Sequence, residues 1–155
     1  MNKFLKTVVA VLFGALVMGC DPVDKPQELP QLDVTPNNVA GSWKLVSWMG
    51  EPLAEGSYVY LDLVRSGRTY TMYQNIDSHD ARTITGRYYI EVDDLGKAVI
   101  RGNYDHSVGE WNNRYVITSL TSEQMIWQAE GNDADVSVYQ RADIPTEIVA
   151  EYTLM

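Results

Sequence analysis

The chain has a single cysteine in its 155 residues, so no disulfide can form within it. Apolar runs are short: residues 7–18 are almost wholly apolar, but a helix that crosses a membrane needs roughly 20 such residues. Positive charge is scarce, with 12 Lys and Arg against 21 Asp and Glu and a net charge of −9. Because a negative surface repels nucleic acid, we expect no nucleic-acid partner.

The first twenty residues have the pattern of an export signal. Residues 1–6 are positively charged, residues 7–18 are apolar, and the small Gly19 stands directly before Cys20. This ending resembles the lipobox of bacterial lipoproteins, in which the signal is removed and the cysteine thiol carries a lipid. The resemblance implies a signal peptide over residues 1–19 and a lipid anchor on Cys20. The alternative is an ordinary secreted protein in which the cysteine is incidental.

Residues 20–38 are predicted to form an extended tether between the lipid and a folded domain. Four prolines are interleaved with polar residues between Asp21 and Pro36, a composition typical of semi-rigid spacers. Removal of the signal deletes Lys3 and Lys6 but no acid, so the net charge changes from −9 to −11. Since such a surface repels anionic headgroups, the acyl chains are expected to supply the membrane attachment. We expect a protein of the cell envelope that is lipid-anchored to a membrane, the outer membrane in preference to the inner. Its folded domain is expected in the periplasm or at the cell surface.

Residues 39–155 predict a single all-β domain. No long helical periodicity occurs there, and short runs rich in Tyr, Val, Ile and Thr are separated by turn residues. Most connections are short, which is typical of an antiparallel meander. A short C-terminal helix is expected over residues 145–152, where Asp143 is a candidate N-cap and Pro145 stands early. The expected strands are residues 42–49, 58–65, 68–74, 82–92, 97–101, 114–120, 124–129 and 135–141.

Alternating side chains predict which face of each strand is buried. Val59, Leu61 and Leu63, for example, share one side of their strand. Such alternation suits a sheet that packs one face on a core. Closing the sheet into a barrel would also remove its exposed edges. The expected fold is therefore an antiparallel meander of about eight strands, closed as a barrel and followed by a short helix.

Several short motifs follow one another along residues 39–150. They are Gly41-Ser42-Trp43, Ser66-Gly67-Arg68-Thr69-Tyr70, Gly86-Arg87-Tyr88, Gly102-Asn103-Tyr104 with Trp111, the stretch from Tyr115 to Thr121, and Tyr139-Gln140-Arg141. The first is similar to the Gly-x-Trp signature that opens lipocalins and related calycin barrels. Their order resembles the lipocalin-like domain of lipoproteins from the Bacteroides group. The resemblance implies a lipocalin-like barrel in which Trp43 plugs the closed end and Arg141 lies over its indole as a structural latch.

Motifs for catalysis or metal binding are scarce. His79 and His106 each lie beside an aspartate, a grouping that can ligate a metal or transfer protons. Both lie in polar stretches between expected strands, where such residues more often build turns. The sequence contains no Gly-x-Ser-x-Gly elbow and no phosphate-binding loop. We therefore expect no enzyme activity, no metal site and no cofactor.

Aromatic residues are the remaining functional signal. After the signal segment the chain contains ten Tyr and four Trp but no Phe. Tyr and Trp suit pocket linings because each joins an apolar ring to a polar group, although they also suit the strands of any small β domain. A barrel of eight strands is near the size at which side chains fill it or leave room for one small ligand. The expected inward faces offer a candidate lining of Tyr70, Met72, Tyr88, Tyr115 and Trp127.

Two functions from different classes stay open. In the first, the protein is a binding module that holds a small apolar or amphipathic ligand beside Trp127, at the barrel end away from Trp43. In the second, the barrel is filled and the protein is a structural or interaction subunit that docks to another envelope protein. A cavity at the candidate lining would favour the first function. A packed interior with an exposed apolar patch would favour the second.

Overall fold

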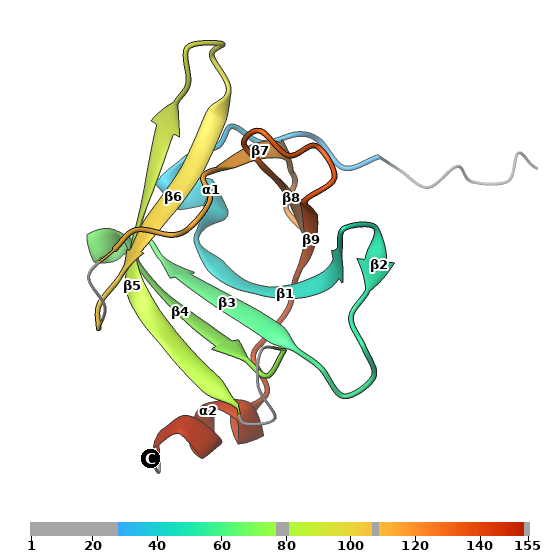
Figure 1. Ribbon diagram of the computed structural model, residues 1–155, viewed down its shortest axis with the longest axis vertical. Coiled ribbons are helices and arrows are strands. Elements are labelled where there is room, and N and C mark those ends of the chain that lie inside the picture. The colour runs from blue at the N-terminus through green and yellow to red at the C-terminus, as the bar shows by residue number, and fades with distance from the viewer. Residues whose placement is uncertain (1–27, 77–80, 107–108, 154–155) are drawn as a thin grey trace, which may run out of the picture.

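The computed structural model describes residues 28–76, 81–106 and 109–153 (Figure 1). The expected signal and Cys20 lie outside the described residues. The described strands form one antiparallel sheet in the order β2-β1-β3-β4-β5-β6-β7-β8-β9, and β1 also pairs with β9. That last pairing closes eight strands into a barrel, with the two-residue β2 added at one side. The predicted all-β barrel with a short C-terminal helix is confirmed.

The strands and helices lie close to the ranges that the sequence predicts. Among the expected strands, the largest difference is at the fifth, which continues beyond residue 101 to Tyr104, and the short elements β2 and α1 were not expected. Among the described residues, no helix has both the length and the apolar character needed to cross a membrane. The strands are β1 Gly41–Trp48, β2 Glu51–Pro52, β3 Val59–Val64, β4 Thr69–Gln74, β5 Arg82–Val92, β6 Ala98–Tyr104, β7 Tyr115–Leu120, β8 Gln124–Ala129 and β9 Val136–Arg141. The helices are α1 Pro36–Val39, the 3-10 turn η1 Ser66–Arg68 and α2 Thr146–Thr153.

The core lies inside the barrel, on the face that alternation selects. In β3, Leu61 and Leu63 are buried and packed into the core, while Val64 is exposed. In β8, Met125 and Trp127 are buried in the same core. Because successive residues of a strand point to opposite faces, each inward set comes from every second position.

The segment before the first strand lies against the barrel (Figure 1). The backbone N–H of Leu32 donates to the carbonyl of Leu120 at the end of β7, with an N···O distance of 2.8 Å. Leu32 and Val34 pack on the core, and α1 follows with Val39 fully buried. This contact falls where the sheet is weakly joined, since β6 and β7 share only the pairs Val99↔Val116 and Ile100↔Tyr115. The second half of the expected tether therefore packs on the barrel.

Trp43 and Arg141 meet at one end of the barrel, where they pair across β1 and β9. The Arg141 guanidinium carbon lies 3.7 Å from the centroid of the Trp43 ring, and Trp43 is fully buried. Trp43 Nε1 donates to the carbonyl of Val39 at 2.8 Å, and Arg141 Nη1 donates to the carbonyl of Ala40 at 2.6 Å. Gly41 allows this approach because a Cβ atom there would overlap the Arg141 guanidinium. We call these residues the closed end.

Candidate functional site

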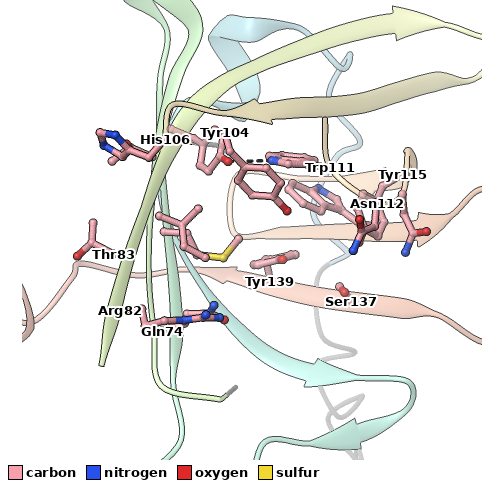
Figure 2. Close-up of a pocket in the computed structure, with 16 residues that line it drawn as sticks. Gln74, Arg82, Thr83, Tyr104, His106, Trp111, Asn112, Tyr115, Ser137 and Tyr139 are labelled. Carbon is pink, nitrogen blue, oxygen red and sulfur yellow. Dashed lines mark hydrogen bonds between the residues drawn. The ribbon is translucent and has the colours of Figure 1, made fainter. Parts of the chain in front are cut away.

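A cavity of about 580 Å³ opens at the other end of the barrel. Ser137, one of its lining residues, pairs with Trp48 at the far end of β1 from Trp43. Figure 2 shows Gln74 and Arg82 side by side, across the cavity from Trp111 and Tyr115. The lining residues are Tyr70, Met72, Gln74, Arg82, Thr83, Ile84, Thr85, Tyr104, His106, Trp111, Asn112, Asn113, Tyr115, Trp127, Ser137 and Tyr139.

Four of the five residues of the candidate lining border this cavity. Tyr70 and Met72 reach it from β4, Tyr115 from β7 and Trp127 from β8. Tyr88 does not border it: it is fully buried in the core, and its hydroxyl donates to the carbonyl of Val64 over 3.4 Å. Alternation along β5 assigns Tyr88 to the inward face but cannot give its depth along the barrel axis.

Five rings form a continuous wall, which we call the aromatic cluster: Tyr70, Trp111, Tyr115, Trp127 and Tyr139. Ring centroids are 5.1 Å apart for Tyr70 and Trp111, which meet edge to face at 75°. Trp127 lies at the centre of the cluster, 5.9 Å from Trp111, 5.5 Å from Tyr115 and 4.8 Å from Tyr139. Contacts at these distances hold each ring in place through its neighbours.

Most polar atoms of the aromatic cluster have partners within the protein. Trp111 Nε1 donates to the Tyr70 hydroxyl at 2.9 Å, and that hydroxyl donates to the carbonyl of Asn103 at 3.1 Å. Asn113 beside Tyr115 and Ser137 beside Tyr139 each act to lower the pKa of the neighbouring phenol. The exception among the described residues is Trp127 Nε1, which is buried and has no hydrogen-bond partner.

Burial keeps the phenols of the aromatic cluster neutral. It raises the pKa of Tyr70, Tyr115 and Tyr139 above the usual value, because a phenolate inside the protein would lose its hydration. The effect is greatest for Tyr139, which lies deepest. At neutral pH these groups therefore act as hydrogen-bonding hydroxyls and do not add negative charge to the cavity.

Two glycines on neighbouring strands make room for Tyr70 and Trp111. A Cβ atom on Gly102 in β6 would overlap the indole of Trp111, and one on Gly86 in β5 would overlap the carbonyl of Asn103 and the ring of Tyr70. The backbone N–H of Trp111 also donates to the carbonyl of Gly102 at 2.8 Å. The position of this ring pair therefore depends on the two glycines beneath it, because a residue with a side chain at either place would occupy the space of a ring.

This arrangement of an antiparallel barrel, closed at one end and hollow at the other, agrees with the comparison with known families. Residues 39–127 match the family described as a lipocalin-like domain. The chain belongs to the lipocalin-like domain family. No curated protein matches the chain. The last strand, β9, lies beyond the matched residues but completes the lipocalin-like barrel by pairing with both β8 and β1.

Sequence reasoning missed several lining residues of the lipocalin-like barrel. Tyr139 and Ser137 alternate on β9, so the period of two could have identified them as inward-facing. Trp111 gives no such signal, because it lies in the irregular connection between β6 and β7, where no periodicity tells the direction of a side chain. Its place in the wall is decided by contacts with Gly102 and Tyr70.

The interior and the mouth of the lipocalin-like barrel differ in polarity. Tyr70, Trp127 and Tyr139 are buried in the interior, whereas Arg82 and Asn112 are exposed at the mouth. The sixteen lining residues include no Asp or Glu, although acidic residues outnumber basic ones in the chain. An apolar ligand with a polar or negatively charged end would therefore meet no carboxylate of like charge in this lining.

Of the two histidines considered for metal binding, one lies in the described part of the chain. His106 borders the cavity and is exposed, whereas His79 lies outside the described part of the chain. Residues 28–76, 81–106 and 109–153 contain no group of three or more His, Cys, Asp or Glu side chains arranged to hold a metal ion.

Proposed function

We propose that this protein is a lipid-anchored lipoprotein of the cell envelope whose lipocalin-like barrel binds a small apolar or amphipathic ligand. The observation that carries the ligand-binding part is the cavity of about 580 Å³ beside the aromatic cluster. Small-molecule sites are typically concave, mainly apolar and of about 300–1,000 Å³, with a few polar groups that orient the ligand. The buried rings suit an apolar body, and the exposed Arg82 and Asn112 suit a polar end.

Binding without catalysis is the role that this lining supports. Among the described residues that line the cavity, none is a carboxylate that could act as a general base, the imidazole of His106 is exposed, and burial keeps the phenols protonated. Catalytic groups need a pKa near the working pH, and a raised phenol pKa moves away from that condition. We therefore infer a carrier or sensor of a small molecule and propose no reaction for it.

The anchor is proposed from the sequence. The pattern that ends at Cys20 resembles a lipobox, and the acidic surface leaves acyl chains as the means of attachment to the membrane. The order of motifs along residues 39–150 resembles lipoproteins of the Bacteroides group, and the outer membrane is the expected location. Replacement of Cys20 by Ser should abolish incorporation of labelled fatty acid and move the protein from the membrane fraction to the soluble fraction. Unchanged labelling of the variant would disprove the anchor.

Ligand binding can be tested by tryptophan fluorescence. Titration with fatty acids, sterols, bile acids or porphyrins should change the emission saturably, because Trp127 lines the cavity. Trp43, Trp48 and Trp111 also emit, and Trp111 lines the cavity too. Trp127→Phe should therefore reduce the ligand-dependent change, and the double variant Trp111→Phe/Trp127→Phe should remove most of it. Trp48→Phe, which replaces an indole outside the lining, should leave the change intact.

The alternative is an interaction subunit of the envelope. The observation in its favour is the pair Trp48 and Met49 at the end of β1, which are 47% and 51% exposed. Exposed large apolar residues are common on monomers, so this pair alone is weaker support than a cavity. Failure of all four ligand classes to bind, together with an interior filled by side chains in solution, would favour this alternative over ligand binding.

A further inference from the structure

The closed end of the barrel, where the described chain starts, also carries an exposed apolar hairpin. We propose that the closed end faces the membrane, that the tip of the β5–β6 hairpin (residues 92–97, the hairpin tip) lies among the lipid headgroups, and that the cavity opens away from the lipid. This inference rests on the proposed lipid anchor and goes beyond it, because it states which end of the barrel contacts the bilayer and that the ligand enters from the aqueous side.

The first described residues lie beside the closed end. The backbone N–H of Leu32 donates to the carbonyl of Leu120, the last residue of β7, at 2.8 Å. Glu28 and Leu29 border a cleft that is also lined by Arg141 of the closed end. The tether from Cys20 therefore joins the barrel at the end opposite the mouth of the cavity.

The length of the tether limits which end of the barrel can reach the lipid. The chain advances eight residues from Cys20 to Glu28 and spans at most about 28 Å when fully extended. Strand β1 has eight residues between the closed end and the open end, and it runs about 25 Å at about 3.3 Å per residue. An open end on the membrane would use almost the whole length of the tether, whereas a closed end on the membrane leaves the tether slack. The tether therefore favours the closed end as the membrane-facing end.

The β5–β6 hairpin projects at the same end. Because neighbouring strands are antiparallel, β1 and β4 run from the closed end to the open end, and β5 runs back toward the closed end. There β4 pairs with β5 no further than Arg87, whereas β5 and β6 remain paired as far as Val92, and Figure 1 shows their hairpin projecting from the barrel. Val92 and Leu95 in the hairpin tip are 72% and 79% exposed, the largest fractions among the exposed large apolar residues that the structure describes. Apolar side chains at such a position suit insertion into the headgroup region of a bilayer.

Many polar groups of the hairpin tip are satisfied within it. The Asp93 carboxylate accepts hydrogen bonds from the backbone N–H of Leu95 at 2.9 Å and from that of Lys97 at 2.7 Å. The backbone N–H of Asp93 donates to the carbonyl of Lys97 at 2.9 Å. Because unpaired backbone groups make burial costly, these bonds lower the cost of entering the headgroup region. The exposed Lys97 suits contact with lipid phosphate, and the exposed Asp94 limits entry to headgroup depth.

Fluorescent labels at single sites test this orientation on the lipidated protein. Because the chain has one cysteine and the proposed lipid blocks its thiol, an added cysteine is the one thiol free for labelling. Leu95→Cys places the label at the hairpin tip, and the matched control Met49→Cys places it at the open end, where Met49 is 51% exposed. Each variant is labelled with a nitrobenzoxadiazole dye and reconstituted into phosphatidylcholine vesicles, with or without a nitroxide near the headgroup end of the acyl chains. Flotation of the vesicles checks the anchor, and the same variants carrying Cys20→Ser are the unanchored controls.

We expect both anchored variants to float with the vesicles. The label at residue 95 should shift its emission to shorter wavelength and lose intensity in the nitroxide vesicles, and the label at residue 49 should do neither. Equal effects at the two positions, or a larger effect at residue 49, would overturn the orientation and leave the anchor standing. A shift at residue 95 without loss of intensity would mean that protein, such as a second copy of the chain, covers the tip, and it would also overturn the orientation. Absence of flotation, with the dye reacting at Cys20 of the wild-type protein, would overturn the anchor and the orientation together.

Discussion

Two buried tryptophans, Trp43 at the closed end and Trp127 beside the cavity, differ in what surrounds them. Their exposed fractions are almost equal, at 0% and 3%. Trp43 Nε1 donates to the carbonyl of Val39, and Arg141 covers the ring. Trp127 Nε1 has no partner among the described residues, and the ring borders open space. Burial therefore does not separate a residue that packs the closed end from one that borders the cavity, whereas the partners of its polar atom and the space beside its ring do.

The two ends also differ in the kind of contact that joins distant segments of the chain. At the closed end, Arg141 donates to carbonyls of Asn38, Ala40 and Ser122, so one side chain of β9 is bonded both to the segment before β1 and to the turn between β7 and β8. At the open end, distant segments are joined mainly by contacts between aromatic rings, together with the hydrogen bonds from Trp111 to Tyr70 and from Tyr70 to Asn103. We expect substitutions at the closed end to act mainly on stability and substitutions at the open end mainly on binding.

The largest effect is expected at the closed end. Trp43→Ala should lower the free energy of unfolding by about 3–5 kcal/mol, the usual cost of removing a large buried aromatic residue. Arg141→Ala should also destabilise, because it removes a cation–π contact of about 0.5–2 kcal/mol and leaves backbone carbonyls without donors. The double variant should cost less than the two single variants together, since residues in contact are not additive. Strictly additive urea-unfolding energies would show that the two side chains do not interact.

A smaller loss of stability is expected where Trp111 packs on the sheet. Gly102→Ala places a methyl group inside the volume of the Trp111 indole, and such overpacking typically costs about 1–3 kcal/mol. It should also weaken ligand binding, because the displaced indole belongs to the wall of the cavity. In a Trp111→Ala background the same substitution should cost almost nothing. An equal cost in both backgrounds, measured by urea unfolding, would rule out the packing contact as its cause.

The raised pKa of the buried Tyr139 should make the free energy of unfolding depend on pH in the alkaline range. The pKa of Tyr139 is raised in the folded state, so the unfolded chain releases this proton first, at its usual value near 10. The contribution of Tyr139 to stability is therefore fully present below pH 10 and is lost as the pH rises from there toward the folded-state value. The expected slope is about 1.4 kcal/mol per pH unit for each such group. Urea unfolding between pH 8 and pH 11 should show a shallower fall for Tyr139→Phe, and an unchanged slope would contradict the assignment.

The smallest effect is expected when a single hydroxyl is removed from a buried tyrosine that does not border the cavity. Tyr88→Phe removes a long hydrogen bond of 3.4 Å to Val64, so the loss of stability should stay below about 1 kcal/mol. Ligand affinity should not change, because Tyr88 does not border the cavity. Tyr115→Phe, the matched change at the open end, should alter ligand affinity. A change in affinity for Tyr88→Phe that equals the change for Tyr115→Phe would mean that the cavity extends farther into the barrel.

Most of the fold could be predicted because strands have a local signal. Leu61 and Leu63 in β3, or Met125 and Trp127 in β8, recur at every second position, and that period identifies both the strand and its buried face. Short turns between such runs then favour an antiparallel meander. The candidate site was less predictable: Tyr70, Met72, Tyr115 and Trp127 border the cavity, but Tyr88 lies in the core. A period of two gives the face of a residue and carries no information about its depth in the barrel.

The sequence by itself determined the order of the strands, their inward faces and the short final helix, because these depend on neighbours within a few residues. Only the tertiary structure decided that Trp111 joins the wall of the cavity and that Leu32 packs beside β7, because neither lies in a periodic segment. The same holds for the free donor of Trp127. Whether a buried N–H has a hydrogen-bond partner depends on atoms that five different parts of the chain bring to one place. A local sequence pattern therefore cannot predict it.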